Sequence, residues 1–170
     1  MAIRIHRPLL IPFLAVFFLN AGPSQRLTYE SVQLDASGQL HIKTVNGKEV
    51  LAPKLPHQSQ FGAPALSLDH TTVGWLAEFE DTSSPSPIDP DAFTLVLYRN
   101  GRILRLVSGD PIIWDWKFER GGKVVAYSTG SRHGGANECL LIDIDSGKVL
   151  KDWLTSSSGQ APSWAEQLRR

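Results

Sequence analysis

The fold is decided by one stretch near the middle of the chain, Thr94-Leu95-Val96-Leu97-Tyr98-Arg99-Asn100-Gly101-Arg102-Ile103-Leu104. Two apolar runs flank Asn100-Gly101, and both residues of an Asn-Gly pair readily adopt the positive φ that a type I′ turn requires. The stretch therefore predicts a β-hairpin. Both faces of its first strand are apolar, so we expect this strand to be the most buried of the chain.

Two further stretches share this hairpin pattern. Residues 39–51 contain the turn Asn46-Gly47, and residues 140–150 contain Ser146-Gly147. The three turns lie 54 and 46 residues apart, a spacing typical of repeat architectures. Alternation of residues predicts one apolar face per strand. The opposite face carries polar side chains, which are His41 and Lys43 in the first copy and Asp143 and Asp145 in the third.

A second pattern recurs between the hairpins. Residues 63–77 and 113–127 each read as a strand, a tight polar turn and another strand, and each is followed by a loop before the next hairpin. Four strands per unit follow, which is how the antiparallel blade of a β-propeller is built. The first unit shows only three strands, at residues 27–34, 39–45 and 48–52.

Over roughly residues 27–165 the chain resembles the TolB-like and WD-type propeller repeats of exported bacterial proteins. In these repeats a Ser-x-Asp-Gly turn precedes a strand that contains valine. Ser67-Leu68-Asp69-His70 matches the pattern except that His70 stands where the family usually has glycine. The resemblance implies an all-β fold with about three blade-like antiparallel repeats, and it implies little about activity.

Three blades fall below the usual minimum of about four, so three arrangements stay open. Two chains could form a six-bladed homodimeric ring, the sheets could pack as a compact β-sandwich, or a partner could cover the edges of a half-propeller. The C-terminal segment 161–170 is also open. Residues 161–165 resemble the strand at residues 63–67, whereas Ser163 and Glu166 form a capping box that predicts a short helix.

The first 25 residues predict a signal peptide. Arg4 and Arg7 precede 12 apolar residues, from Pro8 to Leu19, and this run is too short for a membrane-spanning helix. Small residues between Ala21 and Arg26 suit cleavage there. We therefore expect a secreted or periplasmic protein with a β-repeat domain over residues 26–160 and no stable membrane anchor after cleavage.

Composition excludes several classes of protein. The 17 Lys and Arg residues balance 17 Asp and Glu residues, so nothing indicates a nucleic-acid partner. The single cysteine, Cys139, can form neither an intramolecular disulfide nor a zinc cluster. Acidic pairs near turns lack the ligand spacing of a calcium loop. We predict no cofactor and no metal.

A hydrolase is the alternative drawn from Ser131 and His133, with Asp115 as a third member. Both residues lie in a glycine-rich loop, and the Gly-x-Ser-x-Gly motif is absent. A triad depends on geometry that closeness in sequence does not supply. The chain is therefore more typical of a protein without catalytic activity.

Aromatic residues are one group of candidate contacts. Alternation along residues 113–118 places Trp114 and Trp116 on one strand face. If this face is buried, the two rings form part of the core between repeats. If it is exposed, they form a flat aromatic shelf that could bind protein or carbohydrate. A carbohydrate-binding module that uses exposed tryptophans is therefore a further alternative.

The loops are the second group of candidate contacts. The repeat alignment predicts that the loops after the second strands of two units emerge on the same rim. Arg132 and His133 in one loop would then face Asp89 and Asp91 in the other, forming a mixed-charge surface suited to a protein or peptide. The function expected from the sequence is that of an exported, noncatalytic binding or scaffold protein that recognises a protein or envelope component.

Overall fold

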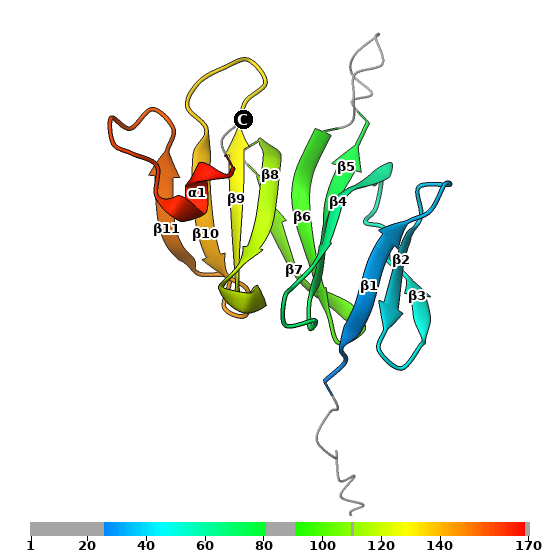
Figure 1. The fold of residues 1–170 in the computed structure, drawn as a ribbon. Helices are drawn as coiled ribbons and strands as arrows, with labels where there is room; N and C mark the ends of the chain where they lie inside the picture. Colours follow the sequence, from blue (N-terminus) through cyan, green and yellow to red (C-terminus); the bar gives the residue numbers. More distant parts are fainter. Residues whose placement is uncertain (1–25, 81–90, 110, 169–170) are drawn as a thin grey trace, which may run out of the picture.

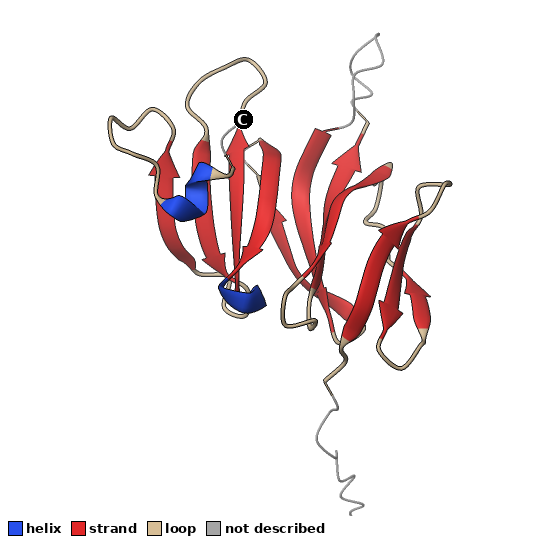
Figure 2. Cartoon of the chain, in the orientation of Figure 1, coloured by secondary structure: helices blue, strands red, loops and turns tan. Residues whose placement is uncertain are grey.

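The computed structural model describes residues 26–80, 91–109 and 111–168. These residues form an all-β fold, so the all-β class expected from the sequence is confirmed (Figures 1 and 2). No helix in these ranges is long and apolar enough to cross a membrane. The predicted signal peptide lies outside the described residues.

Three antiparallel sheets follow one another along the chain, and in each sheet the strands pair in sequence order. None of them closes into a barrel. Sheet 1 has three strands, and sheets 2 and 3 have four strands each. Their bounds are β1 Tyr29–Leu34, β2 Leu40–Thr44 and β3 Glu49–Leu51 in sheet 1; β4 Gln60–Leu66, β5 Val73–Phe79, β6 Asp91–Arg99 and β7 Arg102–Ser108 in sheet 2; and β8 Ile112–Glu119, β9 Val124–Gly130, β10 Glu138–Asp143 and β11 Val149–Leu154 in sheet 3.

The three predicted hairpins are present as β2–β3, β6–β7 and β10–β11. Their turns differ. Asn100 and Gly101 both have positive φ, at 52° and 77°, as the type I′ turn requires. Asn46 does not have positive φ, and only Gly47, at 83°, adopts it. The expectation of a type I′ turn at Asn46 was therefore wrong, because a longer loop with one positive-φ residue closes this hairpin.

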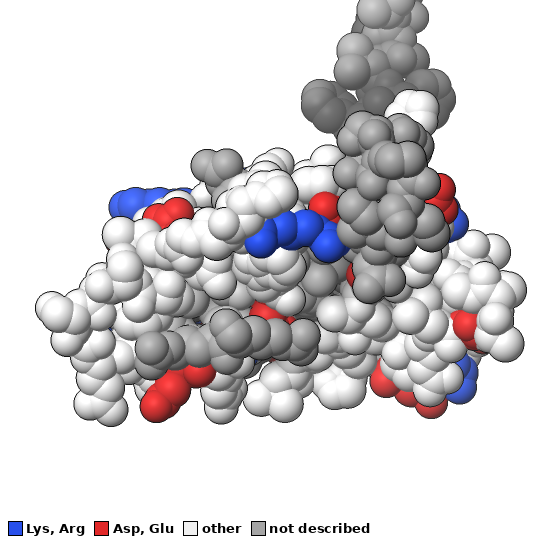
Figure 3. Space-filling model, turned by 90° about the horizontal axis from the view of Figure 1, so that it is seen from above, with Lys and Arg blue, Asp and Glu red and all other residues white. Residues whose placement is uncertain are grey.

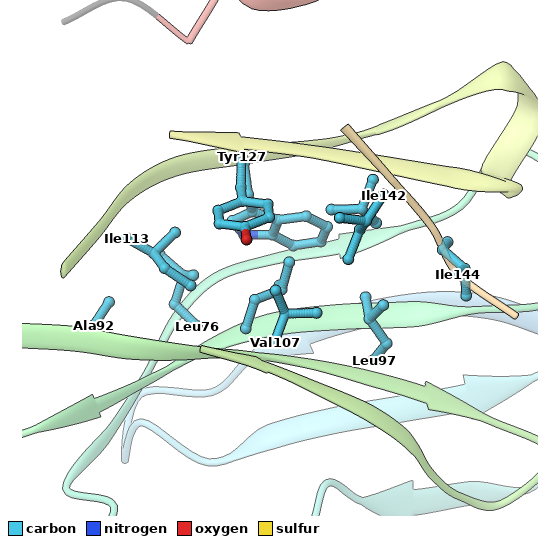
Figure 4. Close-up of a cluster of buried hydrophobic side chains, with 11 residues drawn as sticks. Leu76, Ala92, Leu97, Val107, Ile113, Tyr127, Ile142 and Ile144 are labelled. Atoms are coloured by element: carbon cyan, nitrogen blue, oxygen red, sulfur yellow. The ribbon is translucent and has the colours of Figure 1, made fainter. Parts of the chain in front are cut away.

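Strand β6 contributes to two hydrophobic cores. Leu95 and Leu97 pack toward sheet 3, and Val96 and Tyr98 pack toward sheet 1. The exposed fraction of each of these four side chains is 5% or less. The prediction that this strand is the most buried of the chain is nevertheless wrong, because every residue of β9 is buried, whereas three residues near the start of β6 are not. Figure 4 shows side chains of sheets 2 and 3 pointing toward one another across the hydrophobic core that these two sheets share.

Two arginines of sheet 2 hold the β10–β11 turn of sheet 3. Arg105 donates from Nε to the carbonyl oxygen of Ile144 at 2.9 Å and from a terminal nitrogen to that of Asp145 at 2.7 Å. Arg99, which is buried, donates to Thr72 Oγ1 at 2.8 Å and forms an ion pair with the Asp145 carboxylate. A buried guanidinium is stable only when hydrogen bonds replace water, so these contacts fix sheet 3 against sheet 2.

His70 joins sheet 1 to sheet 2 in the turn between β4 and β5. Its φ of 58° is the left-handed conformation that favours glycine. Its carbonyl oxygen accepts a hydrogen bond from the Tyr29 amide at 2.8 Å, and its ring Nδ1 lies 2.9 Å from the Tyr29 carbonyl oxygen. The histidine therefore keeps the turn and adds a contact that glycine could not make.

The C-terminal segment forms a short helix, α1 Ser163–Glu166, and not a fourth strand of sheet 1. The short helix that the sequence offered as one alternative is present, but the predicted capping box is wrong, because Pro162 is the N-cap and no side chain caps the helix. Ala165 and Leu168 pack on the outer face of sheet 3, where Ala126 and Leu141 are buried. The helix thus covers the face on which a further sheet would otherwise pack.

The outer face of sheet 1 ends the stack with polar groups. His41 Nδ1 lies 2.6 Å from a Glu49 carboxylate oxygen, and its Nε2 lies 2.9 Å from one of Asp35. Lys43 forms an ion pair with Glu30 at 3.0 Å. Helix α1 and these polar pairs therefore lie at the two ends of the stack of sheets. A homodimeric ring stays a prediction.

Gly74 and Trp116 provide a test of the packing between sheets 2 and 3. A Cβ atom at Gly74 would lie 2.5 Å from the Trp116 ring, which is 6% exposed. We expect Gly74→Ala to lower the free energy of unfolding by about 1–3 kcal/mol, because overpacking forces the ring or backbone to move. Denaturant unfolding measures the change. Gly159→Ala is the matched control, since nothing lies within 4 Å of a Cβ there. Equal stability of both variants would contradict this packing.

His41 makes stability depend on pH. Glu49 and Asp35 raise the pKa of His41 above its ordinary value of 6.5. Bonds from Ser37, Gln39 and His41 lower the pKa of Asp35. The charged His41 ring therefore stabilises the fold below pH 6.5, and this stabilisation is lost as the pH rises through the pKa of His41 in the folded protein. The Asp35 carboxylate also stabilises the fold, and its contribution is lost as the pH falls below about 4.

The stability lost in His41→Asn should thus be larger at pH 5.5 than at pH 8.5, measured by denaturant unfolding at both values. Gln33→Ala, a substitution of the residue that pairs with His41 across β1 and β2, is the control without a titrating group. A His41→Asn effect that is the same at both pH values would show that the carboxylates do not stabilise the charged ring.

Candidate functional site

The candidate site lies at the end of the molecule where β6, β8 and the β9–β10 loop meet. Asp91 begins β6 in sheet 2, and Arg132 lies in the β9–β10 loop of sheet 3. Arg132 Nε donates to Asp91 Oδ1 at 2.7 Å, and a terminal nitrogen of the same guanidinium donates to the same oxygen. The predicted approach of Arg132 to Asp91 is therefore present.

Two adjoining hollows lie on either side of Arg132. The first, of about 270 Å³, has an apolar wall beside the ion pair; it is lined by Asp91, Phe93, Pro111, Ile112, Ser131, Arg132 and His133. The second, of about 330 Å³, has the indole of β8 and loop backbone as its walls; it is lined by Trp114, Ser131, Arg132, Gly134, Gly135 and Asn137. Because both include Ser131 and Arg132, the hollows form one continuous surface.

A β-bulge in β8 separates the two tryptophans. The register between β8 and β9 shifts between Ile113 and Asp115, so Trp114 leaves the alternation that would place it beside Trp116. Trp114 lines the second hollow, and its indole Nε1 is buried without a hydrogen-bond partner in the described part of the chain. The predicted shared face is wrong, because alternation along a strand fails at a bulge.

Trp116 belongs to the core and not to the site, which corrects its place among the candidate contacts. Its ring packs edge-on against Phe118 with centroids 5.1 Å apart, and its indole Nε1 donates to the Ala63 carbonyl oxygen at 3.1 Å. Because Trp116 is buried and its indole N–H is already hydrogen-bonded, it does not contribute to the surface of the site. An exposed shelf of two tryptophans is therefore absent from the described residues.

Ser131 and His133 do not assemble a nucleophile and its base. The Ser131 hydroxyl accepts a hydrogen bond from the backbone amide of His133 at 3.2 Å, and among described residues no imidazole reaches that hydroxyl. Asp115 pairs with Ser128 in the sheet and accepts a bond from the Trp116 amide. This geometry is that of a local turn, in which a serine hydroxyl stabilises the loop backbone.

Of the six candidate residues, four lie on this surface, which are Asp91, Trp114, Arg132 and His133. Asp89 lies outside the described residues. Sequence reasoning missed the apolar wall of Phe93, Pro111 and Ile112. Phe93 is 38% exposed and packs against Phe79 with ring centroids 6.2 Å apart. Because Phe93 lies in an apolar run, its sequence context predicts a core residue. A shift of register between β5 and β6 instead turns its side chain outward.

The described surface at this end of the molecule carries no large patch of one charge. Figure 3, which views the molecule from this end, shows basic and acidic side chains interspersed over a largely uncharged surface. No group of three or more His, Cys, Asp or Glu side chains among the described residues could hold a metal ion. The arrangement is chemically one for binding, with apolar walls, an ion pair and exposed loop backbone.

No known protein-family model matches this sequence, and no curated protein matches it either. The functional argument therefore depends on the geometry of the site.

The ion pair that joins the two sheets can be measured with a double-mutant cycle. Asp91 is 13% exposed and Arg132 is 36% exposed, so water screens the pair only in part. We expect a coupling free energy of about 1 kcal/mol between Asp91→Asn and Arg132→Gln, determined from denaturant unfolding of the wild type, both single variants and the double variant. Additive effects of the two substitutions would contradict the contact.

Proposed function

We propose that this protein is an exported, noncatalytic binding protein that recognises a protein or envelope component through the surface around Arg132. One observation carries the proposal: an ion pair between two sheets holds two adjoining hollows together, and exposed aromatic and loop residues line them. Three blade-like sheets form the scaffold. Loops on such a scaffold can carry recognition without disturbing the core.

The chemistry of the surface favours binding over hydrolysis or recognition of sugars. Among the described residues, the Ser131 hydroxyl lacks the imidazole that would make it a nucleophile. Burial of Trp116 removes the second ring of the shelf on which a sugar could stack. What remains is apolar surface beside a charged pair, the combination found in the anchoring pockets of protein interfaces.

Photo-crosslinking in the native host tests this function. The residue p-benzoylphenylalanine replaces His133, which is exposed at the site, or Lys151, which is exposed on β11 away from it. We expect a discrete crosslinked adduct from position 133 and none from position 151. Arg132→Glu should lower its yield about tenfold, which corresponds to roughly 1.4 kcal/mol of binding free energy.

The same cells test export. Fractionation should recover the protein outside the cytoplasm, with a mass that lacks approximately the first 25 residues. A chain that stays in the cytoplasm at full mass would contradict the localisation. Equal adduct yields at positions 133 and 151, or no adduct from either, would contradict recognition by this surface.

A further inference from the structure

The end of the molecule opposite the Arg132 surface is rich in basic side chains. Because consecutive strands are antiparallel, every second turn lies at this end, which is the lower end in Figure 1. These turns are residues 45–48, 67–72, 100–102, 120–123 and 144–148, and the described chain also starts here, with residues 26–28. Together they form the basic end, whose exposed cationic residues are Arg26, Lys48, Arg102, Arg120, Lys123 and Lys148.

Hydrogen bonds between the turns hold the basic end together across the three sheets. The Tyr29 amide donates to the His70 carbonyl oxygen at 2.8 Å, and the Gly101 amide donates to the Tyr29 hydroxyl at 3.2 Å. The Ile144 amide donates to the Lys123 carbonyl oxygen at 3.1 Å. The cations are therefore carried by one continuous surface and not by independent loops.

The positive charge of the basic end is not neutralised within the described ranges. None of the ion pairs there involves any of the six cations. The two acidic residues of the same turns are already engaged. Asp145 pairs with the buried Arg99, and Asp69 accepts hydrogen bonds from the Ser67 and Thr71 hydroxyls at 2.7 and 3.0 Å.

The described turns at the opposite end, which Figure 3 shows, have balanced charge. They carry Lys54 and Arg132 against Asp35 and Glu80. Charge is therefore unequal along the direction of the strands, and a negatively charged surface would attract the molecule with its basic end first.

The two most exposed large apolar side chains of the described residues also belong to the basic end. Leu68 in the β4–β5 turn is 80% exposed, and Val45 in the β2–β3 turn is 61% exposed. They lie on separate turns among the cations, whereas a protein interface presents a contiguous apolar core with a polar rim. Apolar side chains surrounded by Lys and Arg are typical of a surface that enters the headgroup layer of an anionic bilayer.

We propose that the basic end binds reversibly to a lipid bilayer rich in anionic phospholipids, with its cations against the headgroups and Leu68 and Val45 inserted between them. This inference goes beyond the proposed function and does not depend on it. Binding in this orientation turns the Arg132 surface away from the bilayer, where a second partner can reach it.

Cosedimentation with vesicles tests the role of the charges. Lys48→Gln with Lys123→Gln removes two cations from the basic end, and the matched control, Lys54→Gln with Lys151→Gln, removes two cations elsewhere. On equimolar phosphatidylcholine and phosphatidylglycerol we expect about twentyfold weaker binding for the first double variant and little change for the control, because each basic residue near an anionic surface contributes about fivefold. Added salt should weaken binding of wild type.

A fluorophore at position 68 tests insertion. Cys139 is buried, so a nitrobenzoxadiazole thiol reagent labels Leu68→Cys at the new cysteine. We expect its emission to shift to shorter wavelength and to rise on anionic vesicles, whereas the label on Ser157→Cys, exposed at the opposite end, should not respond. Leu68→Ser, which keeps the charge, should weaken binding about fivefold.

The protein is purified in the form that the native host makes, and thermal unfolding verifies that each variant is folded. Equal losses from the two double variants, equal responses of the labels at 68 and 157, or no binding to anionic vesicles would overturn the inference. Binding to heparin or duplex DNA as tight as to vesicles, and unaffected by Leu68→Ser, would overturn it too, because the partner would then be a polyanion without an apolar layer.

Discussion

The structure depends on the burial of one strand, β6, from both of its faces. Leu95 and Leu97 supply the core shared with sheet 3, and Val96 and Tyr98 supply the core shared with sheet 1. Because the side chains of a strand alternate, a one-residue shift in pairing would exchange the two sets. The register of β6 therefore sets which of its side chains pack against each neighbouring sheet.

The candidate site follows from this arrangement. Asp91 is the first residue of β6, and the same packing that buries Leu95 brings the start of β6 beside the loop that carries Arg132. At the other end, Arg99 and Arg105 hold the β10–β11 turn. Sheets 2 and 3 are thus joined by polar contacts at both ends of their shared core, and a rigid junction of this kind keeps the two hollows in place.

Much of the fold could be predicted because its signals are local. Asn100-Gly101 has few alternatives to a tight turn, and alternation in residues 40–44 identifies the buried side of β2. The approach of Arg132 to Asp91 could be predicted from the repeat, since equivalent loops emerge at equivalent ends of equivalent sheets. The apolar wall could not be predicted, because the sequence pattern around Phe93 is that of a core residue. Its exposure results from a shift of register between β5 and β6, which the pattern does not reveal.

The sequence by itself determined the strands, the hairpins, the four-strand repeat and the chemical character of the loops, because each depends on residues that are near one another in the chain. Only the tertiary structure decided that Trp116 is core and Trp114 lines a hollow, since a bulge in β8 and a close approach to Gly74 separate them. It also decided that the C-terminal segment forms a helix on sheet 3. Burial on sheet 3 gives Ala165 and Leu168 apolar contacts, and such long-range contacts are not encoded in the pattern of any single segment.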